Sequence, residues 1–209
     1  MLRLTISTYD QVSRYERLKG YLKKLYQDHE PKKSLTLTQE QVSRFLNVAP
    51  DDTYLVFKVI LIFGFLGAMR REEISKLKRN DVTDGVDSNG NHYLLVQVNN
   101  TKTKVDRPFA ICDQDLYLIC KKYMGIREKI LESDRFFMRY ANGKCTNQAI
   151  GIDTCGGIPK RIGEYLKLPE ASRYTGHCLR RTSATFLIDA GGDITALNDM
   201  EAGDLIQLL

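Results

Sequence analysis

The sequence contains no tryptophan and only three histidines, and it has no hydrophobic run long enough to cross a membrane. Its longest apolar stretch, residues 54–69, is interrupted by Lys58 and two glycines and is shorter than the roughly 20 residues that a bilayer span needs. Residues 1–11 lack the apolar core and the small-residue cleavage site of a secretory signal. We therefore expect neither a membrane protein nor a secreted one.

Cysteine is present but shows no pattern that points to cross-links or metal. The five cysteines are an odd number, and none forms a C-x-x-C pair. A disulfide framework or a structural zinc site is therefore not expected, and we interpret the cysteines as free, buried thiols in a reducing compartment. They are Cys112, Cys120, Cys145, Cys155 and Cys178.

Length and composition indicate a globular chain. It has 209 residues, of which 43% are apolar and 27% charged, enough for one domain or for one domain and a fragment. The net charge of +5 permits a nucleic acid or another anionic partner without requiring one. The charge is uneven, because residues 188–209 carry five acidic and no basic side chains while residues 1–187 are basic. A polyanion would attract the first part and repel the last.

The first segment predicts a single amphipathic helix over residues 10–29, with apolar side chains at helical spacing. A segment of about 35 residues is below the roughly 40 that a free-standing domain usually needs. This helix must therefore dock on another surface. Residues 31–34, Pro-Lys-Lys-Ser, follow it as a short linker.

The next part predicts three helices in close succession. Residues 38–41, Thr-Gln-Glu-Gln, form a capping box that opens a helix ending at Ala49-Pro50. A second helix, capped by Asp51 or Asp52, runs to Leu66 and is apolar almost all round, which predicts the central buried helix. It ends at Gly67, and residues 71–77 predict a short helix with Ile74 and Leu77 facing inward.

The remaining sequence predicts a small sheet and then helices. Residues 84–92 have turn chemistry, and residues 93–98 and 107–111 are β-prone runs that would form a small antiparallel sheet around a polar connection. Helices are expected over residues 114–124, 126–132, 157–167 and 178–190. The fold class is therefore mainly α (α+β), with one small antiparallel β-sheet.

Two charged motifs could carry chemistry. Residues 67–74 read Gly-Ala-Met-Arg-Arg-Glu-Glu-Ile, so a buried helix ends at a glycine and Arg70 follows, with Glu73 spaced to orient it. An ordinary surface ion pair is the alternative. His177 and Arg180 stand three apart at the start of a helix, where both could face one anion. Alternatively His177 caps the helix and Arg180 pairs with an acid.

A lysine between the two predicted strands is a weaker signal. Lys102 lies in residues 101–104, Thr-Lys-Thr-Lys, at the tip of the expected hairpin. A lysine at such a tip is usually solvated, although it could enter a groove and protonate a leaving oxygen.

The three motifs follow one another in the order Gly-Ala-Met-Arg-x-x-Glu-Ile, hairpin lysine and His-x-x-Arg. In this order and in their structural setting they resemble the motifs of the tyrosine recombinases, also called the phage integrase superfamily. The resemblance covers residues 30–197 and implies the tyrosine-recombinase (DNA breaking-rejoining) catalytic domain fold. Residues 101–105, 142–146 and 174–185 are similar to the recombinases of Crypton-type eukaryotic mobile elements and the cellular genes derived from them.

The resemblance also implies a role for each matching residue. Arg70 corresponds to the first catalytic arginine and Glu73 to the acid that supports it. Lys102 corresponds to the general acid for the departing 5′ oxygen, and His177 and Arg180 to the second motif. The two arginines would hold the non-bridging oxygens of the scissile phosphate, whose charge grows during attack. The family needs no metal and no cofactor; its partner is double-stranded DNA, often as a homo-oligomer, and in this branch the location is nuclear.

The chain departs from the family pattern after Arg180. The family nucleophile is a tyrosine about 30 residues further on, but the 29 residues that follow Arg180 contain no tyrosine, histidine or tryptophan. We assign Tyr165 and Tyr174, which precede His177, to packing or surface. Residues 1–35 could hold only the last helix of the family's core-binding domain. The expected organisation is 1–35 helix and linker, 36–197 catalytic domain and 198–209 acidic tail.

Three functional hypotheses follow. The first is a DNA-binding protein, derived from a mobile-element recombinase, that keeps the phosphate pocket but forms no covalent intermediate alone. The second is a working recombinase whose tyrosine comes from another subunit or from a longer form of the chain. The third is a protein interaction module with a relic pocket, in which the acidic tail covers the former DNA face.

Overall fold

The computed structural model describes Gly20, Tyr21, Lys24 and residues 33–99, 106–130 and 132–189. The chain divides into two compact units, Met1–Lys33 and Ser34–Leu209, and the second contains the helices and strands described below. Of the predicted helix over residues 10–29, the three described residues are helical. The rest of that helix and the predicted tail 198–209 lie outside the described residues, and the three-part organisation stays a prediction.

Helix α3, Gln39–Val48, begins as the sequence predicts. The Thr38 side chain accepts a hydrogen bond from the Gln41 backbone N–H at 3.2 Å, and the Gln41 side chain accepts one from the Thr38 N–H at 3.0 Å. This reciprocal pairing satisfies two backbone donors that a helix start otherwise leaves without partners. Just before α3, the Leu37 N–H donates to the Thr182 hydroxyl at 3.0 Å and so ties the start of the unit to its last described helix.

Helix α4, Asp51–Leu66, is the central helix of the unit. Eleven of its residues are buried, which confirms the prediction from its apolar sequence. The predicted aspartate cap is wrong, because Pro50 occupies the N-cap position. Asp51 instead pairs with Lys58 at 2.7 Å and with Lys122 at 2.6 Å. These two lysine partners draw its carboxylate away from the backbone at the helix start.

A three-stranded antiparallel sheet lies against the C-terminal end of α4. It consists of β1 (Val82–Val86), β2 (His92–Val98) and β3 (Arg107–Ile111), with β2 in the middle. The predicted strands 93–98 and 107–111 are confirmed, and β1 is an addition to them. A second hairpin, β4 (Met138–Ala141) with β5 (Lys144–Ala149), was also not expected. Asn142 and Gly143 turn it with φ of 51° and 74°, the left-handed region that favours these residues.

The remaining helices differ from the prediction in one junction and one start: two predicted helices are a single one, and the helix predicted over 157–167 begins at Ile152. Short helix α5 runs Arg71–Lys76, with Ile74 and Leu77 buried as predicted. The predicted helices 114–124 and 126–132 are instead a single helix, α6 (Gln114–Arg127), after which the chain turns. The 3-10 turns are η1 (Arg79–Asp81) and η2 (Ala171–Arg173), and the last helices are α7 (Ile152–Tyr165) and α8 (Cys178–Asp189).

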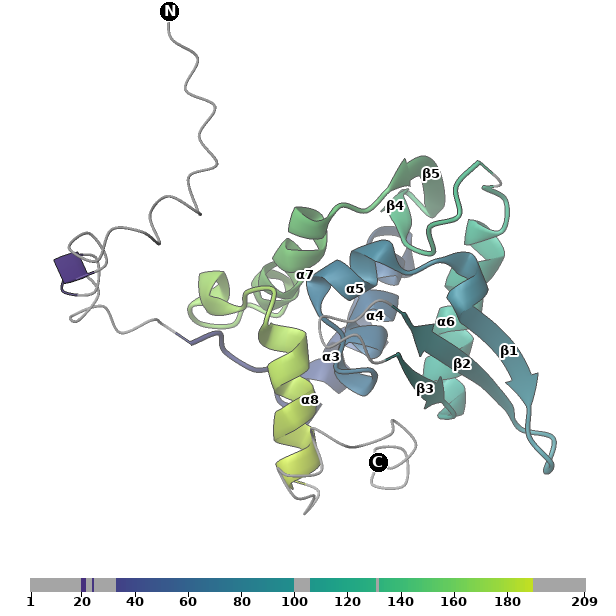
Figure 1. The fold of residues 1–209 in the computed structure, drawn as a ribbon, viewed down its shortest axis with the longest axis horizontal. Helices are drawn as coiled ribbons and strands as arrows, with labels where there is room; N and C mark the ends of the chain where they lie inside the picture. The colour runs from purple at the N-terminus through teal and green to yellow at the C-terminus, as the bar shows by residue number, and fades with distance from the viewer. Residues whose placement is uncertain (1–19, 22–23, 25–32, 100–105, 131, 190–209) are drawn as a thin grey trace, which may run out of the picture. The chain divides into compact units, whose positions relative to one another are not determined.

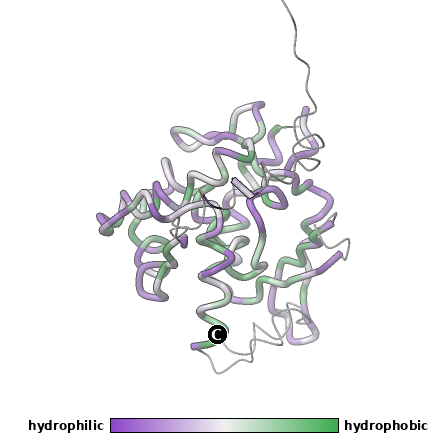
Figure 2. The backbone as a smooth tube through the Cα atoms, turned by 60° about the vertical axis from the view of Figure 1, so that its left-hand side comes forward, coloured by the Kyte–Doolittle hydropathy of each residue, from purple (hydrophilic) through white to green (hydrophobic). Residues whose placement is uncertain are grey.

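The packing around α4 brings distant segments together. Figure 1 shows α4 between α8 on one side and strands β2 and β3 on the other. Gly64 of α4 lies against Leu179 of α8, and Gly67 lies against Phe109 of β3. Figure 2 shows hydrophobic stretches through the middle of the molecule and hydrophilic residues along the loops. The C-terminal end of α4 is thus the point at which α8, β3 and α5 meet.

Candidate phosphate-binding site

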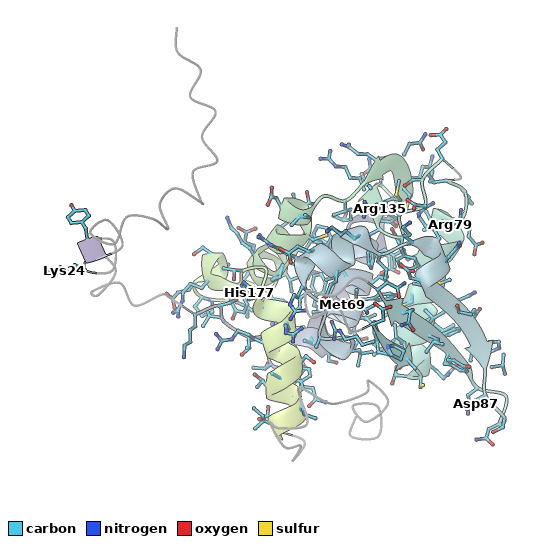
Figure 3. All side chains as sticks on the ribbon, in the orientation of Figure 1. Lys24, Met69, Arg79, Asp87, Arg135 and His177 are labelled. Carbon is cyan, nitrogen blue, oxygen red and sulfur yellow. The ribbon has the colours of Figure 1, made fainter. Side chains whose placement is uncertain are left out.

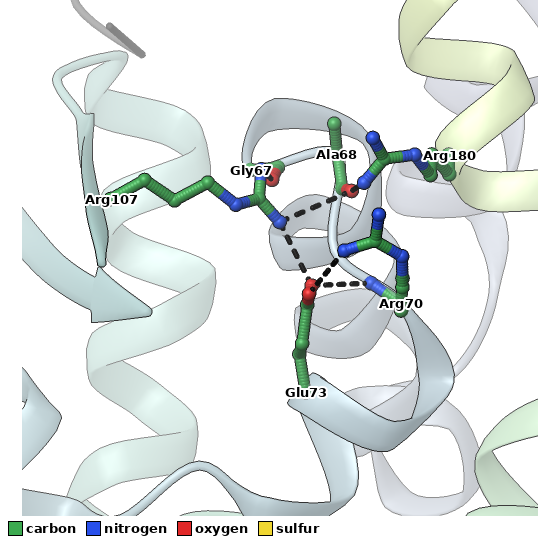
Figure 4. Close-up of polar contacts among 6 residues, drawn as sticks. All are labelled: Gly67, Ala68, Arg70, Glu73, Arg107 and Arg180. Atoms are coloured by element: carbon green, nitrogen blue, oxygen red, sulfur yellow. Dashed lines mark hydrogen bonds and ion pairs between the residues drawn. The ribbon is translucent and has the colours of Figure 1, made fainter. Parts of the chain in front are cut away.

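The C-terminal end of α4 carries a cluster of three arginines around one carboxylate, which we call the arginine cup: Arg70, Arg107, Arg180 and Glu73 (Figure 4). The arginines come from three segments, the α4–α5 turn, the start of β3 and the first turn of α8. Arg180 is separated from the α4–α5 turn by 112 residues in the sequence, so only the tertiary fold brings them together. The cup therefore unites the two arginine motifs that the sequence singled out.

Glu73 holds Arg70 in the way its spacing predicts. Its Oε1 accepts from Arg70 Nη1 at 2.8 Å, and its Oε2 accepts from the Arg70 backbone N–H at 2.8 Å. The Glu73 side chain is only 5% exposed. Burial alone would raise its pKa, but the hydrogen bonds from Arg70 and the charge of Arg107 outweigh that effect and lower the pKa below its ordinary value. The carboxylate is therefore charged and fixed in place at neutral pH.

Arg180 is directed at the same turn. Its Nη1 donates to the Ala68 carbonyl oxygen at 3.1 Å. Ala68 has a φ of 43°, a left-handed conformation that is unusual for a residue with a side chain. The alternative in which Arg180 pairs with an acid is wrong within the described part of the chain. Burial, and then the nearby charges of Arg70 and Arg107, lower the pKa of Arg180 from its ordinary value.

Arg107 is a member of the cup that sequence reasoning missed. Its Nη1 donates to the Gly67 carbonyl at 2.7 Å, and its Nη2 pairs with Glu73 Oε2 at 2.8 Å. A signal was available, because Arg107 alternates with Phe109 and Ile111 along a strand already expected. Both of those residues are buried, so an arginine on the same face needs an acidic or carbonyl partner inside the fold.

His177 lies immediately before α8, one turn ahead of Arg180, and its side chain is exposed (Figure 3). Hydrogen bonds from the backbone N–H of Glu72 and from Arg71 lower the pKa of Glu72, and the charge of His177 adds to this. The preceding residue, Gly176, lies against the Arg71 side chain, which places His177 near the start of α5 and beside the cup. Lys102, the fourth predicted site residue, lies outside the described residues. The catalytic roles of these residues stay predictions.

The two tyrosines that precede His177 are packing residues, as predicted. Tyr174 is 5% exposed. The Tyr165 ring packs against Phe45 and Tyr54, and its hydroxyl donates to the Val48 carbonyl at 3.2 Å. Neither is placed to attack a phosphate in the cup.

The cysteines are all free thiols. Cys120, Cys155 and Cys178 are buried as predicted, whereas Cys112 is exposed and Cys145 is half-buried. Across residues 33–99, 106–130 and 132–189, no group of three His, Cys, Asp or Glu side chains could hold a metal ion. No helix in the described part of the chain is long and apolar enough to span a membrane.

A cavity of about 1180 Å³ lies elsewhere, against the first half of α4, where Tyr54, Phe57, Arg139 and Arg161 are among its lining residues. The 16-residue α4 is about 24 Å long, and the cup lies at its opposite end. The cavity is therefore separate from the cup. Its basic residues provide controls for general charge effects.

Comparison with known proteins identifies the family. The model of the phage integrase family matches residues 36–202. The chain belongs to the phage integrase family. No curated protein matches the sequence. The mainly helical fold with small antiparallel sheets is that of the tyrosine-recombinase catalytic domain.

Solved structures of two recombinases and an integrase share this fold at low sequence identity. The XerH site-specific recombinase bound to difH substrate, in a pre-cleavage complex, superposes with a TM-score of 0.58 at 18% identity over 81% of this chain and 47% of that one. XerA recombinase gives 0.56 at 20% identity over 84% and 56%. The Tn1549 transposon integrase in complex with circular intermediate DNA gives 0.54 at 21% identity over 91% and 65%. This phage integrase chain thus spans about half the length of XerH and XerA.

Proposed function

We propose that a polypeptide of these 209 residues binds double-stranded DNA and receives one backbone phosphate in the arginine cup. The observation that carries this proposal is the gathering of three guanidinium groups around one turn with a single carboxylate: Arg70 and Arg107 pair with Glu73, and Arg180 donates to the Ala68 carbonyl. Three positive charges against one negative charge leave an excess of positive charge at a partly buried point. A phosphodiester supplies the anion that such a point favours.

The donors that remain free suit a phosphate. Among contacts between described residues, Arg70 and Arg180 each use Nη1 alone, so the Nε and Nη2 edge of each guanidinium stays available. This planar edge matches two oxygens of a phosphate group. An anion there would also offset the repulsion from Arg70 and Arg107, which adds to the effect of burial in lowering the pKa of Arg180. The cup is therefore built to hold an anion between Arg70 and Arg180.

The chemistry that would follow is DNA strand transfer, the activity typical of tyrosine recombinases. Arg70 and Arg180 would stabilise the charge that grows on the phosphate oxygens, Lys102 would protonate the departing 5′ oxygen, and His177 would move a proton beside them. Residues 181–209 contain no tyrosine to attack the phosphorus. We infer that this polypeptide alone binds DNA without forming a covalent bond to it.

A second candidate function is strand transfer with a tyrosine supplied by another subunit or by a longer form of the chain. It is favoured by the order that Glu73 imposes on Arg70, with two hydrogen bonds of 2.8 Å to one residue. Donors fixed in advance in this way are what stabilisation of a growing charge in the transition state requires. Mixing this chain with a family member that keeps its tyrosine but lacks its first arginine tests the idea, and cleavage that stays absent would reject it.

The partner and the cellular setting are part of the same proposal. The XerH recombinase structure contains its difH substrate and the Tn1549 integrase structure contains circular intermediate DNA, which supports duplex DNA as the partner here. Binding as a homo-oligomer on DNA is part of what the resemblance to the tyrosine recombinases implies. The Crypton-like eukaryotic branch and nuclear residence are implied by the resemblance in residues 101–105, 142–146 and 174–185. A fluorescent fusion of the chain in eukaryotic cells would test its location.

The binding proposal is tested by fluorescence anisotropy with a duplex of about 30 base pairs, at salt between about 50 and 200 mM. Arg70→Gln and Arg180→Gln should each weaken binding about tenfold or more, since each removes a charge-assisted contact. Arg139→Gln, at the far cavity, removes an exposed arginine and serves as the matched control. Equal affinity of all three variants and the native chain would reject the cup as the DNA site.

The absence of covalent chemistry is tested separately with a nicked suicide duplex. The native chain should leave no DNA adduct that survives denaturation. A stable adduct would show that another residue acts as nucleophile and would overturn this part of the proposal.

A further inference from the structure

The guanidinium group of Arg107 is held by three acceptors on the inner side of the cup (Figure 4). Its Nη1 donates to the Gly67 carbonyl at 2.7 Å, and its Nη2 lies 2.8 Å from Glu73 Oε2 and 3.4 Å from the Ala68 carbonyl. Both terminal nitrogens are therefore committed to protein acceptors. Arg70 and Arg180 differ from Arg107 in this respect, because in contacts with the described residues each uses Nη1 alone.

Strand β3 fixes the position of Arg107. Arg107 pairs with Val98 in the antiparallel register of β2 and β3. Two residues further along, Phe109 is buried against Gly67. The side chain thus extends from a rigid sheet to the turn between α4 and α5. Through this contact the sheet determines where that turn lies.

Two of the three acceptors of Arg107 also hold the other two arginines. Glu73 is the residue that holds Arg70 by its side chain and its backbone. The Ala68 carbonyl is the group that receives Arg180. If Glu73 paired with Arg70 alone, its negative charge would neutralise that arginine. Because Glu73 also pairs with Arg107, the two arginines together keep a net positive charge. Arg107 therefore contacts the supports of both phosphate-binding candidates.

We propose that Arg107 is a positioning residue for DNA binding: it fixes Glu73 and the Gly67–Ala68 carbonyls so that Arg70 and Arg180 face one phosphate, and it makes no phosphate contact itself. The inference rests on the proposed function of the cup. It differs from a role as a third phosphate ligand, because its terminal nitrogens are already occupied. It differs from a purely structural role, because its partners are the supports of the site.

The test combines three variants with DNA binding and thermal unfolding. Arg107→Gln should weaken duplex binding about tenfold, within the range of coupling energies inside one network. Arg107→Lys keeps the charge but cannot donate to all three acceptors. Its affinity for the duplex should lie between that of the native chain and that of Arg107→Gln. Arg135→Gln is the matched control, since Arg135 Nη1 donates to the Ser75 carbonyl of α5 at 2.9 Å outside the cup. It should lower thermal stability without changing the affinity measured well below the melting temperature.

Two further readouts separate positioning from direct contact. A direct phosphate ligand contributes about 0.9 to the slope of log affinity against log salt, so its loss should reduce the slope by that amount. For Arg107→Gln we expect an unchanged slope. In a Glu73→Gln background, Arg107→Gln should cost less than about twofold, because its main acceptor is already altered. A reduced slope, or full additivity of the two substitutions, would overturn the inference.

The inference and the proposed function can fail independently. If Arg70→Gln and Arg180→Gln leave DNA binding unchanged, the function of the cup is wrong and Arg107 has nothing to position. If those two variants weaken binding while Arg107→Gln and Arg135→Gln both match the native chain, the cup stands and the role of Arg107 is rejected.

Discussion

Arg180 reaches across the fold to the Ala68 carbonyl, with its Nη1 3.1 Å from that oxygen. A single main-chain group therefore links Arg180 of α8 to the α4–α5 turn that carries Arg70. The same carbonyl is 3.4 Å from Arg107 Nη2. One backbone oxygen thus orients two guanidinium groups.

The first prediction concerns Arg180→Lys. Lysine keeps the charge, but its single ammonium group cannot bind the Ala68 carbonyl and present a flat edge to a phosphate at once. We expect duplex affinity to fall about tenfold, which corresponds to about 1.4 kcal/mol. The measurement is anisotropy at fixed salt. Arg181→Lys, at the exposed next position of α8, should leave the affinity unchanged. Equal losses at both positions would mean that only charge density on α8 matters.

The second prediction concerns pH and Glu73. Its pKa in the folded chain is below the ordinary value of 4.5. Such a carboxyl group stabilises the fold at pH values above its unfolded-state pKa, and this contribution is lost as pH falls through the lower, folded-state pKa. Unfolding by urea at several pH values below about 5 should therefore show a shallower loss of stability in Glu73→Gln than in the native chain.

At neutral pH the same substitution should lower the free energy of unfolding by about 1–3 kcal/mol, because it leaves buried charged donors poorly paired. Glu40→Gln, exposed in the first turn of α3, is the control and should keep the native pH slope. If Glu73→Gln also keeps that slope, its carboxylate is not the group that titrates with unfolding.

The sequence predicted the cup only in part, for reasons that individual residues make clear. Arg70 and Glu73 were accessible because their contact is local, three residues apart on one turn. The pairing of that turn with Arg180 followed from the family resemblance and not from periodicity. The burial of helix α4 was predicted well because a helix that is apolar almost all round is stable only when it is buried on all sides.

The elements that the sequence did not predict lie where local residue preferences favour a loop or give no clear alternation. Strand β1, Val-Thr-Asp-Gly-Val, contains two turn-forming residues, so its sequence is typical of a loop, and its pairing with β2 decides its conformation. Hairpin β4–β5 had an Asn-Gly turn signal but polar, mostly exposed strands without clear alternation. The strand alternation indicates that Arg107 faces inward. Its partners, the Gly67 and Ala68 carbonyls, are brought to β3 only by the tertiary fold, so the sequence alone could not identify them.

The third prediction concerns the contact between α4 and β3. A Cβ on Gly67 would lie 2.4 Å from Phe109 Cε1, so Gly67→Ala forces the ring to move. Gly67 has a φ of −85°, so alanine suits its backbone and the cost is steric. We expect Gly67→Ala to destabilise by about 1–3 kcal/mol, and Phe109→Ala by about 3–5 kcal/mol.

The double variant should lose less than the sum of these values, because the added methyl enters space that the ring leaves. Denaturant titration of the four chains measures the coupling. Gly125→Ala in α6, where a Cβ would meet nothing within 4 Å, is the control and should not destabilise. If the losses of stability in Gly67→Ala and Phe109→Ala are strictly additive, the two positions do not share one contact.

The fourth prediction separates rigidity from stability at Ala68, whose φ of 43° places a side-chain-bearing residue in the left-handed region. Ala68→Gly removes strain of about 1 kcal/mol but increases the freedom of the unfolded chain by a similar amount. Stability should therefore change little. The more flexible turn should hold its carbonyl less firmly for Arg180, and DNA affinity should fall about threefold. Ala110→Gly in extended strand β3 should do the reverse, with lower stability and native affinity. If Ala68→Gly binds DNA like the native chain, the left-handed turn does not contribute to preorganising the cup.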